Sequence, residues 1–198
     1  PRTARPFVTL VASAVPDDAT LVDLFKRYPR LDLLTNMLTQ EILRGPGELT
    51  PAQRETLFAF GSGMNACHFC HGAHTAIAEA LGADAQLIRS AVEDLDSAAL
   101  DPKMRPLFAY VRKLTLTPSR VTRADADAVR AVGWSDQALH EAITVCALHN
   151  FFNRWVDGSG VDAPDAWLQG NGGRLGPGRL LCVTGKGGLT PQAPFNPT

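Results

Sequence analysis

Long apolar runs are missing from this 198-residue chain, in which no stretch approaches the roughly 18–20 residues that a membrane-spanning helix needs. An excess of one charge is also missing, because 19 lysines and arginines face 20 aspartates and glutamates and leave a net charge of −1. Such a chain has no basic field for nucleic acid or anionic lipid. Only four cysteines are present, too few for a disulfide-built scaffold of this size. We therefore expect no nucleic-acid partner and no membrane.

Apolar residues, by contrast, make up an ordinary 45% of the sequence and charged residues 20%, as in a globular protein with a substantial core. Residues 7–15 follow two arginines and are loosely similar to the apolar region of a secretory signal. Thr9 and Ser13 interrupt this region, its nine residues are few for a signal, and Pro1 fits a chain whose initiator methionine was removed. We expect a cytoplasmic, reducing location, in which thiols stay free.

Apolar residues recur at helical spacing through most of the chain, and no segment shows the sustained alternation of a half-buried strand. Local signals divide the pattern: Thr50-Pro51 joins a hydroxyl N-cap to a proline at the first helical position, and the Gly-Pro-Gly at 45–47 ends the segment before it. We predict an all-α fold of about eight helices. They are expected near residues 17–28, 31–44, 51–60, 67–81, 84–95, 102–116, 122–133 and 135–155.

A change of composition after residue 169 marks the end of the helical pattern. Residues 170–198 hold eight glycines and four prolines with few apolar anchors. We expect an N-terminal extension over 1–16, a helical domain over 17–168 and a Gly/Pro-rich C-terminal arm over 169–198. Composition alone predicts a disordered arm. We expect the arm instead to lie against another surface, such as a neighbouring subunit. Cys182 in the arm can be free or cross-linked.

Reactive side chains are concentrated between Cys67 and His74, in the sequence Cys-His-Phe-Cys-His-Gly-Ala-His. On a helix, Cys67 and Cys70 are i, i+3 neighbours, and Cys70 and His74 are i, i+4 neighbours. Two thiols so spaced can form a disulfide, and the helix start favours a thiolate. The imidazole can accept or return the thiol proton near neutral pH. This stripe is our candidate for redox chemistry.

Glu55 is the candidate that completes the stripe. If the helices on either side of Asn65 fold back on each other, Glu55 lies ten residues before the turn and His74 nine after it. At about 1.5 Å of rise per residue the two are level, and the carboxylate can orient His74 as a base. The small residues at 61–63 would let these two helices approach closely.

Other interpretations of these residues stay open. Cys67, Cys70, His71 and His74 could bind zinc, although one helix rarely directs four ligands at one tetrahedral centre. The same segment spells Cys-x-x-Cys-His, the attachment motif of c-type haem, which needs an axial ligand. The methionines available for that position are Met37, Met64 and Met104. Inert buried thiols are the structural alternative.

The long last helix carries further polar side chains. His149 and Asn153 form an i, i+4 pair that either adds to the pocket or is a hydrogen-bonded core histidine with its partner. We expect Arg154 to form an ion pair or cap the helix end, Cys146 to be a small buried hydrophobe, and His140 to be exposed.

The spacing of four residues resembles the signature of the AhpD-like alkyl hydroperoxidases within the carboxymuconolactone decarboxylase family. The pattern is Glu55, eleven intervening residues and then Cys67-x-x-Cys70-x-x-x-His74. The stretch 150–154, Asn-Phe-Phe-Asn-Arg, is similar to the end of the core in the peroxidase-related branch. The likeness covers roughly residues 17–165. It implies an all-α, AhpD-like helical domain, a homo-oligomer (a trimer or hexamer) and thiol-based reduction of a hydroperoxide substrate.

Position by position, the resemblance implies that Cys70 attacks the peroxide and passes through a sulfenic acid, and that Cys67 resolves it. His74 and Glu55 would be the proton relay. No bound cofactor is implied; the Cys67–Cys70 disulfide would be reset by an external dithiol donor protein. One departure is Phe69, where these proteins often have a histidine.

We expect, then, a thiol-dependent peroxidase or disulfide oxidoreductase. The first alternative is a decarboxylase-like enzyme acting on a lactone acid, which does not depend on a Cys-x-x-Cys. The second is a non-catalytic oligomer that binds a ligand or metal.

Overall fold

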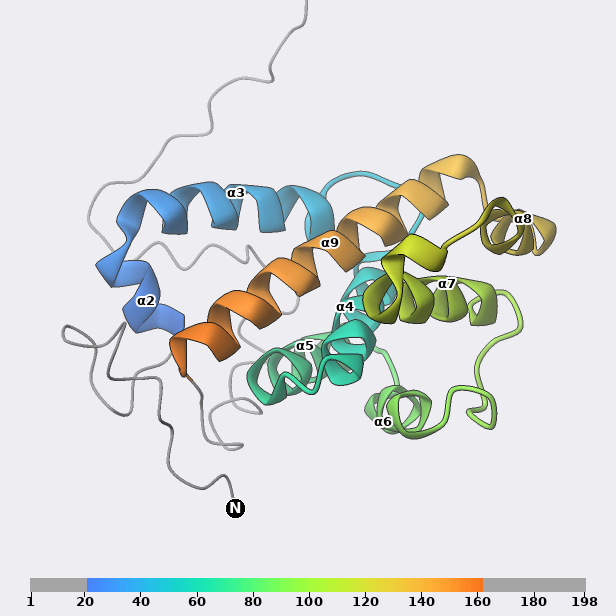
Figure 1. The fold of residues 1–198 in the computed structure, drawn as a ribbon, viewed down its shortest axis with the longest axis horizontal. Helices are drawn as coiled ribbons and strands as arrows, with labels where there is room; N and C mark the ends of the chain where they lie inside the picture. Colours follow the sequence, from blue (N-terminus) through green and yellow to red (C-terminus); the bar gives the residue numbers. More distant parts are fainter. Residues whose placement is uncertain (1–20, 162–198) are drawn as a thin grey trace, which may run out of the picture.

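The computed structural model describes residues 21–161, and the regular structure in that range is helical, without strands (Figure 1). This confirms the all-α prediction of about eight helices. The predicted extension 1–16 and arm 169–198, with Cys182, lie outside the described residues. The elements are α2 (Leu21–Arg27), α3 (Pro29–Arg44), α4 (Pro51–Met64), α5 (His68–Ala80), α6 (Ala85–Glu93), α7 (Arg105–Leu116), the 3₁₀ helix η1 (Pro118–Arg120), α8 (Arg123–Ala131) and α9 (Asp136–Ser159).

Local capping and turns explain several of these boundaries. Thr50 Oγ1 accepts a hydrogen bond from the backbone N–H of Gln53, whose side chain accepts from the backbone N–H of Thr50, so α4 begins with a capping box. Helix α7 begins three residues later than the sequence indicated. The carboxylate of Asp101 accepts a hydrogen bond from the backbone N–H of Lys103 and holds a turn there.

Helix α4 lies at the centre of the described residues and contacts α3, α5, α6, α7 and α9. The 24-residue α9 crosses the molecule beside it and also contacts α3, α5, α7 and α8 (Figure 1). The core follows from this arrangement, since Leu57, Phe58 and Phe60 of α4 are fully buried. The ring of Phe60 packs at 4.8 Å from that of Phe108 on α7. Residues 57–62 of α4 are all buried, so this part of the helix is enclosed by protein.

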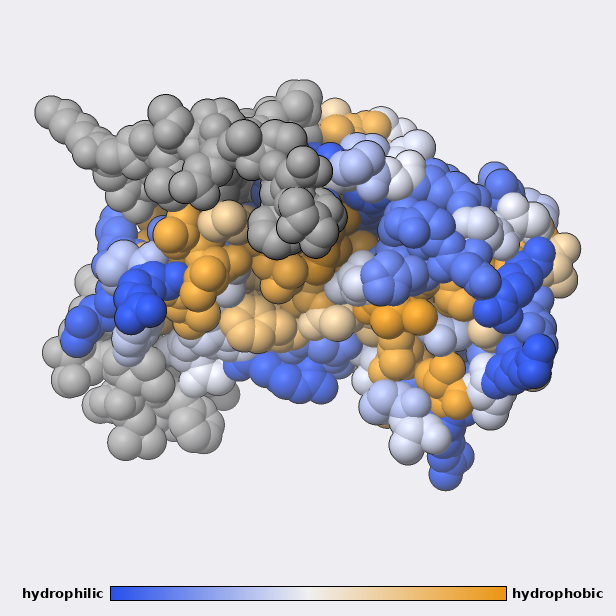
Figure 2. Space-filling view, turned by 90° about the horizontal axis from the view of Figure 1, so that it is seen from above, coloured by the Kyte–Doolittle hydropathy of each residue, from blue (hydrophilic) through white to orange (hydrophobic). Residues whose placement is uncertain are grey.

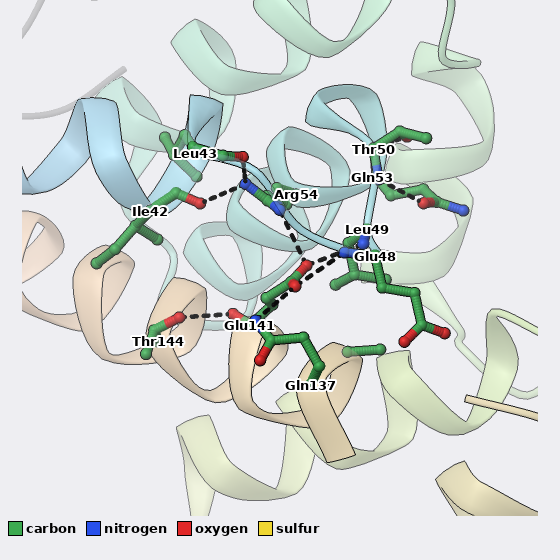
Figure 3. Close-up of polar contacts among 12 residues, drawn as sticks. Ile42, Leu43, Glu48, Leu49, Thr50, Gln53, Arg54, Gln137, Glu141 and Thr144 are labelled. Carbon is green, nitrogen blue, oxygen red and sulfur yellow. Dashed lines mark hydrogen bonds and ion pairs between the residues drawn. The ribbon is translucent and has the colours of Figure 1, made fainter. Parts of the chain in front are cut away.

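A buried ion pair fixes α4 against α9 and against the loop that precedes α4 (Figure 3). Arg54, 2% exposed, places Nη2 3.0 Å from Glu141 Oε2 of α9 and donates through Nη1 to the carbonyl of Gly45 at 2.7 Å. The Glu141 carboxylate also accepts the backbone N–H groups of residues 48–49, both at 2.9 Å. Burial raises the pKa of Glu141, but these hydrogen bonds and the arginine charge outweigh it and leave that pKa below its usual value. These contacts of Arg54 fix the position of α4 directly beside Glu55, the next residue of the helix.

The small residues at 61–63 act only in part as predicted. They were expected to bring α4 and α5 together, but a Cβ built at Gly61 would overlap the ring of His149 on α9. Gly63 is the position that faces α5 and α6, since its Cβ would meet His71 and Val92. The reason is the helical period: neighbouring positions point in different directions, so a run of small residues serves more than one partner.

Helix α3 leaves large apolar side chains exposed. Five of them, between 37% and 62% exposed, are Leu31, Leu33, Leu34, Met37 and Leu38. We call this set the α3 apolar face. Figure 2 looks onto the α3 side of the molecule and shows apolar surface gathered there. Among residues 21–161, no helix is long and apolar enough to cross a bilayer.

Candidate active site

Helices α4 and α5 form an antiparallel hairpin that brings the candidate residues together. Asn65 caps the end of α4, Ala66 takes a left-handed backbone conformation with φ of 55°, and Cys67 is the N-cap of α5. Glu55 and His74 then lie level on the two helices, with Glu55 Oε2 2.5 Å from His74 Nδ1. The register expected from the sequence is present, while the chemical roles of these residues stay a prediction.

The Glu55 carboxylate is completely buried and lies between two partners. Oε2 meets His74, and Oε1 lies 2.7 Å from Nη1 of Arg44, the last residue of α3. The Arg44 side chain is only 8% exposed. A buried carboxylate is tolerated when a buried cation compensates it, and Arg44 lies in that position beside Glu55. Sequence reasoning missed Arg44, because a basic residue in a last helical turn has an ordinary local role there.

The imidazole of His74 is held on two sides. Its ring stacks on Phe58, with 3.5 Å between centroids and 23° between planes. Its Nδ1 faces the Glu55 carboxylate, so Nδ1 carries the hydrogen and Nε2 is the nitrogen that can take up a proton. His74 is therefore arranged as an oriented base. Phe58 was also missed, since a phenylalanine in a helical apolar pattern indicates only core.

Cys67 and Cys70 are both buried, at 0% and 2% exposed, and both are free thiols. A hydrogen bond to Cys67 raises the pKa of the Cys70 thiol well above its usual value, and burial and the charge of Cys67 add to this. The Asn153 side chain acts in the opposite direction. The balance of these effects favours the protonated thiol of Cys70 over the thiolate.

His149 is a hydrogen-bonded core histidine, one of the two roles that the sequence allowed. It is fully buried, with Nε2 3.4 Å from Thr115 Oγ1 and Nδ1 3.4 Å from Asn153 Oδ1. Burial lowers the pKa of His149 to about 4, so the ring is neutral at pH 7.

The remaining residues singled out from the sequence are less involved. Cys146 is buried beside Thr115, and His140 is exposed, both as predicted. Among the described residues, Arg154 donates to the carbonyl and to the side-chain oxygen of Asn150, which lies one turn earlier on the same helix. The expected ion pair or helix cap of Arg154 stays a prediction.

Two of the four residues considered as zinc ligands, His71 and His74, contact other groups of the protein. His71 Nδ1 lies 2.9 Å from the carbonyl oxygen of Ala59, and His74 Nδ1 faces Glu55. Within the part of the chain that the structure describes, no group of three or more histidine, cysteine, aspartate or glutamate side chains is arranged to hold a metal ion.

Comparison with known proteins agrees with this geometry. Residues 30–113 match the family model described as the carboxymuconolactone decarboxylase family. The matched part of the chain is therefore similar to that family. The matched range contains all four candidate residues of the Cys-x-x-Cys site: Glu55, Cys67, Cys70 and His74. The search of curated proteins gave no match.

Solved structures of several proteins share the fold of this chain. An AhpD-core, peroxidase-related protein from Ralstonia eutropha is 21% identical with a TM-score of 0.70, over 79% of this chain and 81% of that one. A peroxidase-related protein from a Silicibacter species is 22% identical with a TM-score of 0.66, over 80% and 94%. The debrominase Bmp8 with 2,3,4-tribromopyrrole is 16% identical with a TM-score of 0.63, over 74% and 79%. At these identities the likeness establishes the fold.

Proposed function

We propose that this protein is a thiol-dependent oxidoreductase that reduces hydroperoxides through Cys67 and Cys70, with Glu55 and His74 as the proton relay. The observation that carries the proposal is the buried Glu55 carboxylate 2.5 Å from His74 Nδ1. This pair orients an imidazole one helical turn from Cys70, beside a second thiol. The peroxidase-related proteins with this fold support the same chemistry.

The reaction has three balanced steps. The Cys70 thiolate attacks one peroxide oxygen, the O–O bond breaks, and the alkoxide leaves with a proton from the relay as an alcohol. The sulfur is oxidised to a sulfenic acid. The thiol of Cys67 then condenses with it, forming the Cys67–Cys70 disulfide and releasing water. A dithiol donor protein reduces this disulfide by exchange and becomes a disulfide itself.

The α3 apolar face supports the further proposal that the protein is a homo-oligomer, a trimer or hexamer. Its five side chains are between 37% and 62% exposed on one helix, and exposed apolar patches of this kind mark interaction sites. A cytoplasmic location, where a dithiol donor would be available, stays a prediction.

Peroxide consumption with dithiothreitol as the reductant tests the proposal. We expect turnover by the wild type and none by Cys70→Ser, while Cys67→Ser, reduced and then freed of dithiothreitol, consumes about one equivalent of peroxide without turnover. Cys146→Ser is the matched control, because it changes a buried cysteine outside the pair and keeps turnover. Turnover by Cys70→Ser at the wild-type rate would contradict the proposal.

The family match keeps one second candidate, a decarboxylase-like activity on a lactone acid. Such an enzyme does not use the two sulfurs. Turnover of a lactone acid by the double variant Cys67→Ser/Cys70→Ser would establish it in place of the peroxidase.

A further inference from the structure

The turn between α4 and α5 determines where Cys67 lies. The backbone N–H of Ala66 donates to the carbonyl oxygen of Gly63 at 2.9 Å, and that of Cys67 donates to the carbonyl oxygen of Ser62 at 3.1 Å. This pair of hydrogen bonds is the Schellman motif, which ends a helix on a residue in the left-handed conformation. Cys67 is both the last residue of this motif and the N-cap of α5. Its position therefore depends on the turn.

The residue in the left-handed conformation is Ala66, with φ of 55°. Glycine is the usual residue at this point of the motif, because the Cβ of any other residue is crowded there. Among residues 21–161, Ala66 is the one residue other than glycine with a positive φ. The turn is therefore unfavourable by itself, and contacts from outside it must support it.

Asn153 of α9 makes such contacts at both ends of the turn. Its Oδ1 accepts a hydrogen bond from Nδ2 of Asn65, the C-cap of α4, at 2.8 Å. Its Nδ2 donates to Oγ of Ser62 at 3.0 Å, and the carbonyl of the same serine accepts the backbone N–H of Cys67. Asn153 and Ser62 are 2% and 0% exposed, so water does not compete for these hydrogen bonds.

The neighbouring side chains fix which end of each amide faces the turn. A guanidinium can only donate, so the Asn150 atom that lies 2.6 Å from Nη1 of Arg154 is Oδ1. Nδ2 of Asn65 lies 3.1 Å from this oxygen, and the atom of Asn153 that faces the same nitrogen is also an oxygen. The NH₂ group of Asn153 is left for Ser62.

We propose that Asn153 is a positioning residue that holds Cys67 in place as the disulfide partner of Cys70, acting through Ser62 and Asn65. The proposal gives a role to the stretch 150–154, which the sequence singled out. It deepens the proposed function and rests on it, since the two cysteines are taken as the redox pair.

The step that depends on this position is the condensation of the two sulfurs. The S–S bond forms between Cys67 and Cys70 while the S–O bond of the Cys70 sulfenic acid breaks, and the hydroxyl group leaves as water with the proton of the Cys67 thiol. A thiol held one helical turn from its partner reacts as if it were highly concentrated. Without Asn153 the turn can leave the left-handed conformation, so Cys67 spends less time beside Cys70.

The test is a thiol–disulfide equilibrium with glutathione, which uses no peroxide. The protein is equilibrated with mixtures of reduced and oxidised glutathione, its free thiols are alkylated, and peptide mass spectrometry gives the ratio of the Cys67–Cys70 disulfide to the dithiol. This ratio reports the effective concentration of one thiol for the other. We expect Asn153→Leu and Asn65→Ala each to lower it about tenfold, as the loss of buried hydrogen bonds predicts.

A rescue variant separates support of the turn from general packing of α9. In Ala66→Gly/Asn153→Leu the glycine takes the left-handed conformation freely, so the effective concentration should return most of the way to the wild-type value. The control is Asn36→Leu, which changes a buried asparagine whose side chain donates to the carbonyl of Asp32 on its own helix. Its ratio should equal that of the wild type.

Two results would overturn the proposal: a wild-type ratio in both Asn153→Leu and Asn65→Ala, or no recovery in the rescue variant. Circular dichroism confirms that each variant is folded. Asn65 is partly exposed, so Asn65→Ala keeps the test valid if Asn153→Leu does not fold. A wild type that forms the disulfide with glutathione but consumes no peroxide would contradict the proposed function alone, and the tenfold loss in the variants would still support the role of Asn153.

Discussion

Glu55→Gln keeps the shape of the buried side chain and removes its charge. In the structure that charge lies between the Arg44 guanidinium, 2.7 Å away and 8% exposed, and the His74 ring at 2.5 Å. Removing one partner of a buried ion pair costs about 3–5 kcal/mol, because the other charge is left uncompensated. The glutamine oxygen still accepts one hydrogen bond, so we expect the lower end, about 3 kcal/mol.

Urea unfolding at pH 7 measures this loss, and a double-mutant cycle assigns it. Arg44→Met alone should also destabilise, whereas Arg44→Met with Glu55→Gln should cost less than the sum, because no unpaired charge is left. Peroxide turnover by Glu55→Gln should fall about a hundredfold, since the imidazole loses its orienting carboxylate. A loss of stability below about 1 kcal/mol, additive with Arg44→Met, would refute the buried Arg44–Glu55–His74 arrangement.

Three further outcomes follow from the packing. His149 is protonated near pH 6.5 in the unfolded chain and only near pH 4 in the folded chain. The free energy of unfolding should therefore fall by about 3 kcal/mol as the pH drops from the first value to the second. Urea unfolding of His149→Gln over the same pH range should lack this loss. Gly61→Ala should destabilise the fold by about 1–3 kcal/mol, because the new Cβ overlaps the ring of His149. Gly158→Ala is the control, because the added Cβ would meet open space there. Equal changes of the melting temperature in the two variants would contradict this prediction. Thr50→Ala should cost about 1 kcal/mol by chemical denaturation, and an unchanged midpoint would argue against the capping box.

Local signals account for what could be predicted from the sequence. Thr50-Pro51 marks the start of α4 because both the cap and the proline act within one turn. The Glu55–His74 pair could be predicted because a single turn at Asn65 fixes the register of two helices. Both inferences depend on short stretches of chain, where helix geometry leaves few alternatives.

What the sequence could not show depends on contacts between distant segments. Arg44 reaches Glu55 because α3 packs on α4, and no local pattern distinguishes it from other basic residues at helix ends. Asn153 donates to Ser62 of α4 from a helix that begins more than seventy residues later along the chain. The direction of Gly61 was misjudged for the same reason, since its partner His149 belongs to α9.

The central claim is that Cys67 and Cys70 form one redox pair. The direct measurement is to reduce the protein fully, add one equivalent of cumene hydroperoxide, alkylate the remaining thiols and map the peptides by mass spectrometry. We predict a loss of two hydrogens confined to the peptide that joins Cys67 to Cys70, with Cys146 still alkylated. Recovery of Cys67 and Cys70 as alkylated thiols, with the peroxide unconsumed, would contradict it.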